Sequence, residues 1–387
     1  MAIKFLLVGI MALKNGKIGL FPLKENIYLA AKWEALETYN LSFDFNGGTS
    51  SSGNSLSITN RDFYNNMVVL PTVTKDGFDF YGYSIGNYLI TDSNMKLDLA
   101  LLRSVFGSQK NLTLTAKYIG VDDAHIGDYY KFGSYPQSKV KNISIIEALK
   151  SAKDTDDDGY LNYENDEYEV VYERYSRKIG YFKVEPIVWE VKSDGTLVSS
   201  MILDSKCYNY TFGERTYQGV LIYGNNYKYS TIRAFLNGYN GSDYGVENFT
   251  GKGFYDLAFT QEEKAKILET IVDNSAKTTY DSPNQYVCEN TNDKIYLMSF
   301  SEMRKTNHGY KNDQDRMRKG TDYAIARGLD VESNNHSYYW TRSPSSGDSD
   351  CAWYVRSDGD LRCNNCVSSD PRAGDRTGVL PALKISK

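Results

Sequence analysis

The sequence is poor in the residues that most often carry catalysis or cross-link a small domain. Its 387 residues include three histidines, five cysteines and eight prolines. The cysteines are odd in number and unevenly spaced, which argues against a disulfide framework. No H-E-x-x-H, P-loop or G-x-G-x-x-G motif accompanies the histidines. The sequence therefore predicts a protein that is not an enzyme, with no assigned catalytic residue.

An excess of basic charge and a long apolar run are also absent. With 44 basic and 49 acidic residues the formal net charge is -5, so we expect no nucleic-acid binding. No apolar run reaches the roughly 18 residues of a transmembrane helix, which predicts no membrane span. The apolar stretch Phe5–Leu13 leaves two interpretations of residues 1–34 open, a signal segment or a truncated repeat.

Tyrosine, by contrast, is abundant, with 33 residues. Its side chain offers a large contact area at low cost in conformational entropy and is enriched in recognition surfaces. The chain is long enough for two or three domains with their own cores. The composition is thus typical of a folded binding protein.

A repeated strand pattern marks the N-terminal third of the chain. The segment Asn26–Trp33 recurs 85 positions later as Asn111–Tyr118, and the alternating run Leu41–Phe45 lies between the two copies. Period-2 alternation with turn residues between the runs predicts a small, mostly antiparallel sheet.

The same region resembles the internalin B-type Listeria/Bacteroides repeat of bacterial surface proteins. The resemblance is carried by Phe43–Gly48, Leu70–Pro71, Lys75–Phe78, Gly82–Tyr83 and Leu112–Tyr118. It implies a β-grasp-like spacer over residues 35–120, preceded by a truncated copy or N-terminal segment at 1–34.

Helix signals appear after Gly120. Apolar spacing or caps predict helices near residues 144–152, 230–238, 260–270 and 321–327, with strands before and after them. This pattern predicts one α+β domain over residues 121–387, and an α+β fold class for the chain.

An acidic segment in this domain has the spacing of a calcium loop. Asp154, Asp156 and Asp158 precede Gly159, but the twelfth position is Asn165 instead of Glu. We therefore expect an acidic hairpin turn and no cofactor, with calcium as the alternative.

Two further motifs are weak indicators of chemistry. Gly82–Gly86 matches the G-x-S-x-G pattern of a nucleophile elbow, but it lies within the β repeat. Cys363 and Cys366 form a single C-x-x-C pair, which is too few ligands for a closed zinc site. We expect no metal at either place.

The segment Ser345–Gly378 differs in composition from the rest of the chain. Its 34 residues contain six Asp, six Ser, four Arg and three of the five cysteines, but no Lys, Glu, Gln or Met. These four types number 61 in 387 residues, so about five are expected in a segment of this length. Random replacement of both adenines in A-A-pyrimidine codons yields every residue here except Trp353. The alternative is a polar, turn-rich surface whose bias is accidental.

The motifs around this segment resemble the variable proteins of diversity-generating retroelements, which share a C-type-lectin fold related to formylglycine-generating enzyme. The resemblance is carried by Tyr338–Pro344, Ala352–Val355, Asp358–Leu361 and Gly378–Leu383, and upstream by Phe132–Pro136, Val184–Trp189 and Ile295–Ser299. Leu380 stands where Arg is commoner, a departure that concerns scaffold packing. The resemblance implies a rigid domain over residues 121–387 that displays varied side chains, within 345–378, to a ligand.

Strand alternation predicts that Trp340, Trp353 and Val379 point into the core while the varied residues share one exposed face. The predicted ligand-binding residues are Tyr338, Tyr339, Ser346, Asp348, Asp350, Cys351, Tyr354, Arg356, Asp358, Asp360, Arg362, Asn364, Asn365, Ser368, Asp370, Arg372, Asp375 and Arg376.

We therefore expect a hypervariable receptor or adhesin-type protein on a cell surface or phage virion. Its ligand would be a protein or glycan on another cell or virion. One alternative is a surface adhesin or wall-associated lectin-like domain of fixed specificity. A second is an oxidase resembling formylglycine-generating enzyme that uses Cys363 and Cys366.

Overall fold

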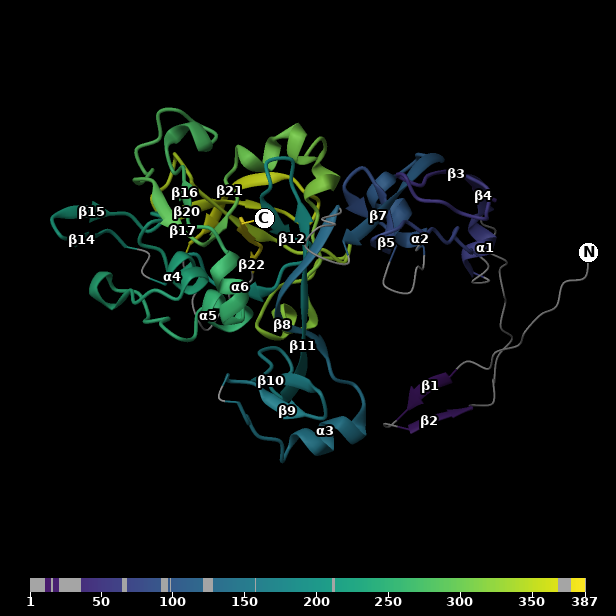
Figure 1. Ribbon diagram of the computed structural model, residues 1–387, viewed down its shortest axis with the longest axis horizontal. Coiled ribbons are helices and arrows are strands. Elements are labelled where there is room, and N and C mark those ends of the chain that lie inside the picture. The colour runs from purple at the N-terminus through teal and green to yellow at the C-terminus, as the bar shows by residue number, and fades with distance from the viewer. Residues whose placement is uncertain are drawn as a thin grey trace, which may run out of the picture. The chain divides into compact units, whose positions relative to one another are not determined.

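The computed structural model describes residues 11–14, 17–20, 36–64, 68–91, 97, 99–120, 128–156, 158–210, 213–367 and 377–386 (Figure 1). The chain divides into two compact units, Met1–Glu37 and Thr38–Lys387. In the first unit, β1 (Met11–Lys14) pairs antiparallel with β2 (Lys17–Leu20). The predicted strand copy Asn26–Trp33 lies outside the described residues, as do residues 5–10 of the apolar stretch.

The predicted α+β class is wrong, because strands take up 37% and helices only 17% of the part of the chain that the structure describes. The fold is dominated by β-sheets. Helices do occur, but the longest one in the described residues, α2 (Leu99–Phe106), has eight residues. None of the helices that the structure describes is long and apolar enough to cross a membrane.

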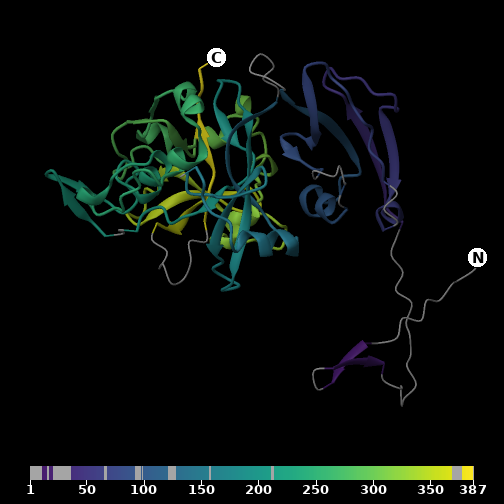
Figure 2. The same ribbon diagram turned by 60° about the horizontal axis from the view of Figure 1, so that its bottom comes forward.

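Residues 38–120 form one lobe of the larger unit (Figure 2). Its elements are β3 (Thr38–Asp44), β4 (Ser55–Thr59), α1 (Asn60–Tyr64), β5 (Phe78–Ile85), β6 (Tyr88–Leu89), α2 and β7 (Asn111–Gly120). The strands β3 and β7 pair in parallel, and β4 and β5 flank them antiparallel. Residues alternate between exposed and buried along β3, as predicted, and Tyr39, Leu41 and Phe43 lie in the core.

The G-x-S-x-G motif lies in this lobe and does not form a nucleophile elbow. Ser84 is buried within β5, and its hydroxyl group donates to the carbonyl oxygen of Gly86 at 2.9 Å. The chain continues through a turn into β6 instead of entering a helix. Gly86 takes a left-handed φ of 59° in this turn, so the motif has a structural role.

The second lobe is built on the long antiparallel pair β8 (Tyr129–Lys139) and β11 (Ile179–Val191). One parallel contact, between Ile119 of β7 and Tyr129 of β8, joins the sheets of the two lobes. The main path of this 12-stranded sheet is β18-β23-β12-β11-β8-β7-β3-β4. Its other strands in this lobe are β9 (Leu161–Tyr163), β10 (Asp166–Tyr172), β12 (Leu197–Ser199), β18 (Ile295–Leu297) and β23 (Pro381–Leu383).

A second sheet has five strands in the order β13-β22-β19-β20-β21. These strands are β13 (Asp204–Ser205), β22 (Gly378–Val379), β19 (Tyr339–Pro344), β20 (Cys351–Val355) and β21 (Leu361–Cys366). Two small antiparallel pairs complete the lobe, β14 (Arg215–Tyr217) with β15 (Val220–Ile222) and β16 (Thr270–Val272) with β17 (Thr291–Asp293).

Local capping signals define the helices of this lobe. The Ser230 side chain accepts a hydrogen bond from Arg233 N at the start of α4 (Thr231–Asn237), and Gly238 ends the helix with a φ of 68°. The predicted capping box of Thr260 and Glu263 opens α6 (Gln261–Lys266). The remaining α-helices are α3 (Ile143–Leu149), α5 (Phe254–Ala258) and α7 (Asp322–Ala326), and the 3-10 helices are η1 (Ser242–Tyr244), η2 (Ala276–Thr278), η3 (Glu302–Arg304), η4 (Thr306–His308) and η5 (Asp313–Arg316).

Buried apolar side chains form three clusters. One fills the lobe of residues 38–120 and includes Tyr83. A second packs β8 and β11 against α4 and α5 and includes Trp189. The third includes Tyr339 and Leu380 beside β18 and β19, so Leu380 is a packing residue, as predicted.

Candidate functional site

The five-stranded sheet packs apolar side chains on both faces, with Trp340 in one core cluster and Tyr339 and Val355 in another. Trp353 of β20 packs against the rings of Phe300 and Tyr280, with centroid distances of 4.4 and 5.4 Å. The Trp340 indole N–H of β19 donates to the carbonyl oxygen of Lys206 at 2.9 Å. The prediction that Trp340, Trp353 and Val379 point into the core is confirmed by their burial.

Tyr339 is not a ligand-binding residue, which corrects the sequence prediction. All six residues of β19 are buried, because this central strand is covered on both faces. The Tyr339 side chain is fully buried, and its hydroxyl group donates to the carbonyl oxygen of Arg316 at 2.6 Å. Strand alternation predicts an exposed face only where one side of a sheet meets solvent. Tyr338 is half-buried, so part of its side chain is accessible to a ligand.

Exposed side chains gather on the outer side of the β20–β21 hairpin. Tyr354 of β20 lies opposite Arg362 of β21 in the strand register, and its hydroxyl group donates to Oδ1 of Asn364 at 3.2 Å. Its ring contacts the Tyr338 ring edge-on at 5.8 Å. Arg362 and Asn364 are exposed, whereas Tyr354 is half-buried. Two tyrosine rings and two hydrogen-bonding side chains thus share one surface.

The hairpin turn adds charged groups of both signs. Arg356 lies 3.8 Å from the Asp358 carboxylate, and Arg362 Nε lies 2.7 Å from Oδ2 of Asp360. The negative charge of Asp358 raises the pKa of Arg356. The turn therefore exposes both positive and negative side chains, and its surface is not dominated by charge of one sign.

The loop before β20 carries three more of the predicted ligand-binding residues. The side chain of Asn225 fixes the backbone of this loop. The Asn225 amide nitrogen lies 3.4, 2.9 and 3.0 Å from the carbonyl oxygens of Ser345, Asp348 and Cys351. Asp348 is exposed and Asp350 half-buried. Partial burial and, after it, the charge of Asp348 raise the pKa of Asp350.

Ser346, the third residue of this loop, is half-buried, and its hydroxyl group donates to the carboxylate of Asp281. This bond orients the Ser346 side chain toward a residue outside the segment Ser345–Gly378.

The prediction of Cys351 as a ligand-binding residue is also corrected, because Cys351 is only 7% exposed. It lies opposite Cys366 in the strand register, and Cys363 is half-buried. The side chain of Cys366 lies outside the described part of the chain, so the structure assigns no geometry to the C-x-x-C pair.

The remaining predicted residues cannot be located. Ser368, Asp370, Arg372, Asp375 and Arg376 lie outside the described residues. For Asn365 the structure gives only the backbone pairing with Ala352.

The aspartates of the predicted calcium loop do come together. Oxygen atoms of Asp154, Asp156 and Asp158 all lie within 4.8 Å of one another. The Asp154 carboxylate accepts hydrogen bonds from the backbone N–H groups of Asp158 (3.3 Å) and Gly159 (2.8 Å). These bonds are those of an acidic turn, and all three side chains are exposed. The same oxygens could hold a hard cation such as calcium.

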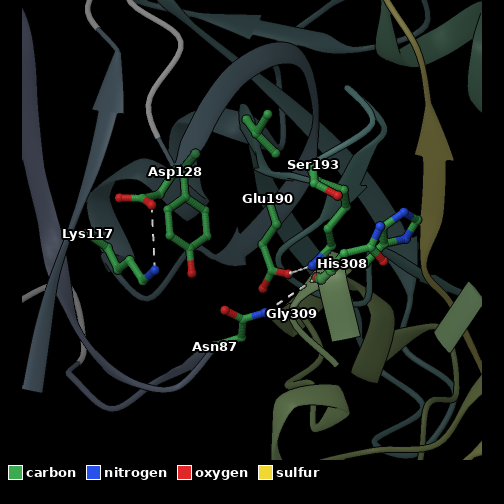
Figure 3. A pocket seen from close by; sticks show the side chains of 11 residues that line it. Asn87, Lys117, Asp128, Glu190, Ser193, His308 and Gly309 are labelled. Atoms are coloured by element: carbon green, nitrogen blue, oxygen red, sulfur yellow. Dashed lines mark hydrogen bonds and ion pairs between the residues drawn. The ribbon is translucent and has the colours of Figure 1, made fainter. Parts of the chain in front are cut away.

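A polar cavity of about 300 Å³ lies where the two lobes of the larger unit meet (Figure 3). Glu190 at the end of β11 accepts hydrogen bonds from Lys192 at 2.6 Å and from Arg318 at 2.8 Å. On the other wall, Lys117 pairs with Asp128 at 3.5 Å. Among the lining residues Lys192 balances Glu190 and Lys117 balances Asp128, so we assign the cavity a role in joining the lobes.

Sequence reasoning missed the buried ion pair of Glu190 with Arg318 beside this cavity. Arg318 follows Glu190 by 128 residues, and no local pattern marks either residue as one half of a pair. The one signal is the position of Glu190 directly after the apolar run that ends in Trp189.

The C-terminal half of the chain matches a known family. The model of the family described as Domain of unknown function (DUF6273) matches residues 193–387. The chain belongs to this family. The DUF6273 region begins directly after β11 and contains the whole five-stranded sheet, whereas the lobe of residues 38–120 precedes it. No curated protein and no solved structure matches the chain.

Proposed function

We propose that the chain is a hypervariable ligand-binding protein, diversified by a retroelement, whose DUF6273 region presents varied side chains on a rigid sheet. The observation that carries the proposal is the overlap between the biased segment Ser345–Gly378 and the exposed side of the β20–β21 hairpin. In this proposal the varied residues form the recognition surface.

Burial within the segment supports this proposal. Four buried residues of the segment, Ala352, Trp353, Val355 and Val367, are apolar, whereas Ser345, Ser357 and Thr377 are buried polar residues. The accessible side chains of the hairpin are Tyr354, Arg356, Asp358, Asp360, Arg362, Cys363 and Asn364, with Leu361 beside them. Tyrosine, arginine and small polar residues on a rigid base are typical of antibody binding loops. A rigid base lowers the entropic cost of binding.

In this proposal the protein acts on a cell surface or phage virion and binds a protein or glycan on another surface. The resemblance of residues 35–120 to a surface-protein repeat supports the location. A fixed-specificity adhesin would use the same sheet, but without sequence variation.

Sequencing the gene's locus tests the proposal. We expect a nearby reverse-transcriptase gene and a template copy of the segment that differs from it only at adenines. Sibling genes should differ at Tyr354, Arg362 and Asn364 and agree at Trp353 and Val355, because only the first three side chains reach solvent. A locus with neither the gene nor the template would overturn the proposal. An unchanged segment across related genomes would indicate the fixed adhesin.

A further inference from the structure

A second cavity, of about 320 Å³, lies in the larger lobe away from the varied segment. Its walls come from β8, β10, β13, α4, α5 and α7, and none of its lining residues falls between positions 345 and 378. Phe235, Phe249 and Tyr323 contribute aromatic surface. A largely preformed, aromatic-lined cavity with a few polar groups is the usual form of a small-molecule site.

Two polar groups in this cavity lack partners. Tyr160 is 4% exposed, and its buried hydroxyl group makes no hydrogen bond. The carboxyl group of Glu169 has neither a hydrogen bond nor an ion pair among the residues that the structure describes. Leaving a buried hydroxyl group unpaired is costly, so Tyr160 favours a ligand that supplies a hydrogen bond, and the half-buried Glu169 offers a second polar group on the cavity wall.

The other charged groups of the cavity already have partners. Asp204 accepts a hydrogen bond from the Tyr135 hydroxyl at 3.0 Å and lies 3.7 Å from Arg327. At the rim, Lys252 pairs with Glu247 at 2.7 Å.

The last cation, Lys206, lies over the Phe235 ring at 4.6 Å. The lining contains three acidic and three basic residues, so the formal charge of the cavity is zero. A balanced site with unpaired hydroxyl and carboxyl groups favours a neutral ligand over an ionic one.

We propose that this cavity binds one neutral sugar ring, whose hydroxyl groups form hydrogen bonds with Tyr160 and Glu169 and whose C–H face packs on the aromatic wall. A sugar ring combines the two features that the cavity requires, an apolar face and an edge of hydroxyl groups. The site is fixed by the fold and does not depend on the varied surface.

The pH dependence of binding follows from the surroundings of Glu169. Burial raises the pKa of Glu169 to about 7; the nearby Arg327 opposes this shift and Asp204 adds to it. The other titratable groups that line the cavity are Tyr135, Tyr160, Lys206, Tyr210, Glu247, Lys252 and Tyr323. A neutral ligand that covers the carboxyl group favours its protonated form, so affinity should fall as the pH rises through 7. An ammonium ligand would show the opposite trend.

The test uses the full chain and the methyl glycosides of glucose, galactose, mannose and N-acetylglucosamine, with choline and phosphate as charged comparisons. Saturation-transfer NMR and calorimetry at pH 6 should detect saturable binding of at least one glycoside. Tyr160→Phe should weaken that binding about tenfold, the loss of one hydrogen bond. Glu169→Gln should bind with no dependence on pH, whereas Glu169→Ala should lose at least tenfold.

Tyr172→Phe is the matched control, because it removes an exposed tyrosine hydroxyl on β10 that lines neither this cavity nor the varied surface, and it should leave glycoside binding unchanged. Tyr160→Phe removes a hydroxyl group without a partner, so its melting temperature should not fall. The proposal is overturned if no glycoside binds, if choline or phosphate binds instead, or if both cavity variants bind as the wild type does. None of these results bears on the retroelement proposal.

Discussion

At the scale of single residues, Arg342 connects β19 to three other segments of the chain. Its guanidinium group donates to the carbonyl oxygens of Leu297 at 2.7 Å and Asp273 at 3.0 Å. It also binds both carboxylate oxygens of Glu302, at 2.5 and 3.1 Å. The side chain of Arg342 is 2% exposed and that of Glu302 is 23% exposed, so this bidentate pair is largely shielded from water and fixes β19 in place.

The Glu302 carboxylate should contribute to stability in a pH-dependent way. Burial alone would raise its pKa, but Arg342 and Ser299 outweigh burial and lower the pKa of Glu302 to about 2. The folded-state pKa lies below the unfolded one, so the stabilisation is present above about pH 4.5 and is lost as the pH falls toward 2. Glu302→Gln should lower the free energy of unfolding by about 3 kcal/mol at pH 7, measured by urea titration.

The matched control is Glu147→Gln in the exposed pair of Glu147 and Lys150. It should change the unfolding free energy by less than about 0.5 kcal/mol, because exposed pairs contribute little. An equal loss in both variants would contradict the role given to Glu302.

At the scale of elements, the β20–β21 hairpin depends on one glycine in its turn. Gly359 has a left-handed φ of 85°, and a Cβ atom there would lie 1.7 Å from the backbone oxygen of Asp313. The Arg316 side chain also donates to the Gly359 carbonyl oxygen at 2.8 Å. The turn is therefore fixed to η5, although it lies in the middle of the biased segment.

Gly359→Ala should destabilise the protein by about 2 kcal/mol, because it combines backbone strain with a clash against rigid backbone. Thermal unfolding measures the effect. Gly347→Ala serves as the control in the same segment, since its nearest neighbour would be Ser345 Oγ at 3.9 Å and its φ is not left-handed. The two variants should differ clearly in melting temperature, and similar values would refute the assignment.

Elements with local signals were predictable, whereas those set by distant contacts were not. The caps Ser230, Gly238 and Thr260 lie next to the helices that they begin or terminate, so their spacing in the sequence was enough to predict these helix ends. Tyr339 was misplaced because its burial results from strands and loops far away in the chain. The accessible residues Tyr354 and Arg362 were predicted as surface residues, because β20 and β21 are close in sequence.

At the scale of the whole molecule, short contacts join the two lobes of the larger unit. The Tyr88 hydroxyl of β6 and Nε2 of His336 in the DUF6273 region lie 2.6 Å apart, although 248 residues separate them in sequence. Burial lowers the pKa of His336 to about 4. The imidazole is therefore neutral in the folded protein near neutral pH.

His336 should make the protein less stable in acid. Its folded-state pKa lies below the unfolded value of 6.5, so its contribution is complete above pH 6.5 and is lost as the pH falls to 4. Between pH 7 and 4 the wild type should lose about 3 kcal/mol more unfolding free energy than His336→Gln, which hydrogen-bonds but does not titrate. Denaturant titrations of both proteins at each pH give this difference, and parallel pH profiles would contradict it.

The fold class was wrong at this scale for a physical reason. Capping rules indicate where a helix starts but say little about how far tertiary packing lets it continue, and α6 ends at Lys266 instead of near Thr270. The long pair of β8 and β11 organises the lobe through contacts that sequence patterns do not reveal. Short helices around extensive sheets give a β-dominated molecule.

The hydrogen bonds from Asn225 to the loop before β20 do not depend on which side chains the loop carries. The amide holds only carbonyl oxygens, which every amino acid carries, and its codon lies 120 positions upstream of Ser345. Substitutions at Ser346, Asp348 or Asp350 therefore leave these contacts intact. The path of this loop therefore depends on a residue outside the segment Ser345–Gly378, and the loop can carry different side chains while its backbone keeps the same course.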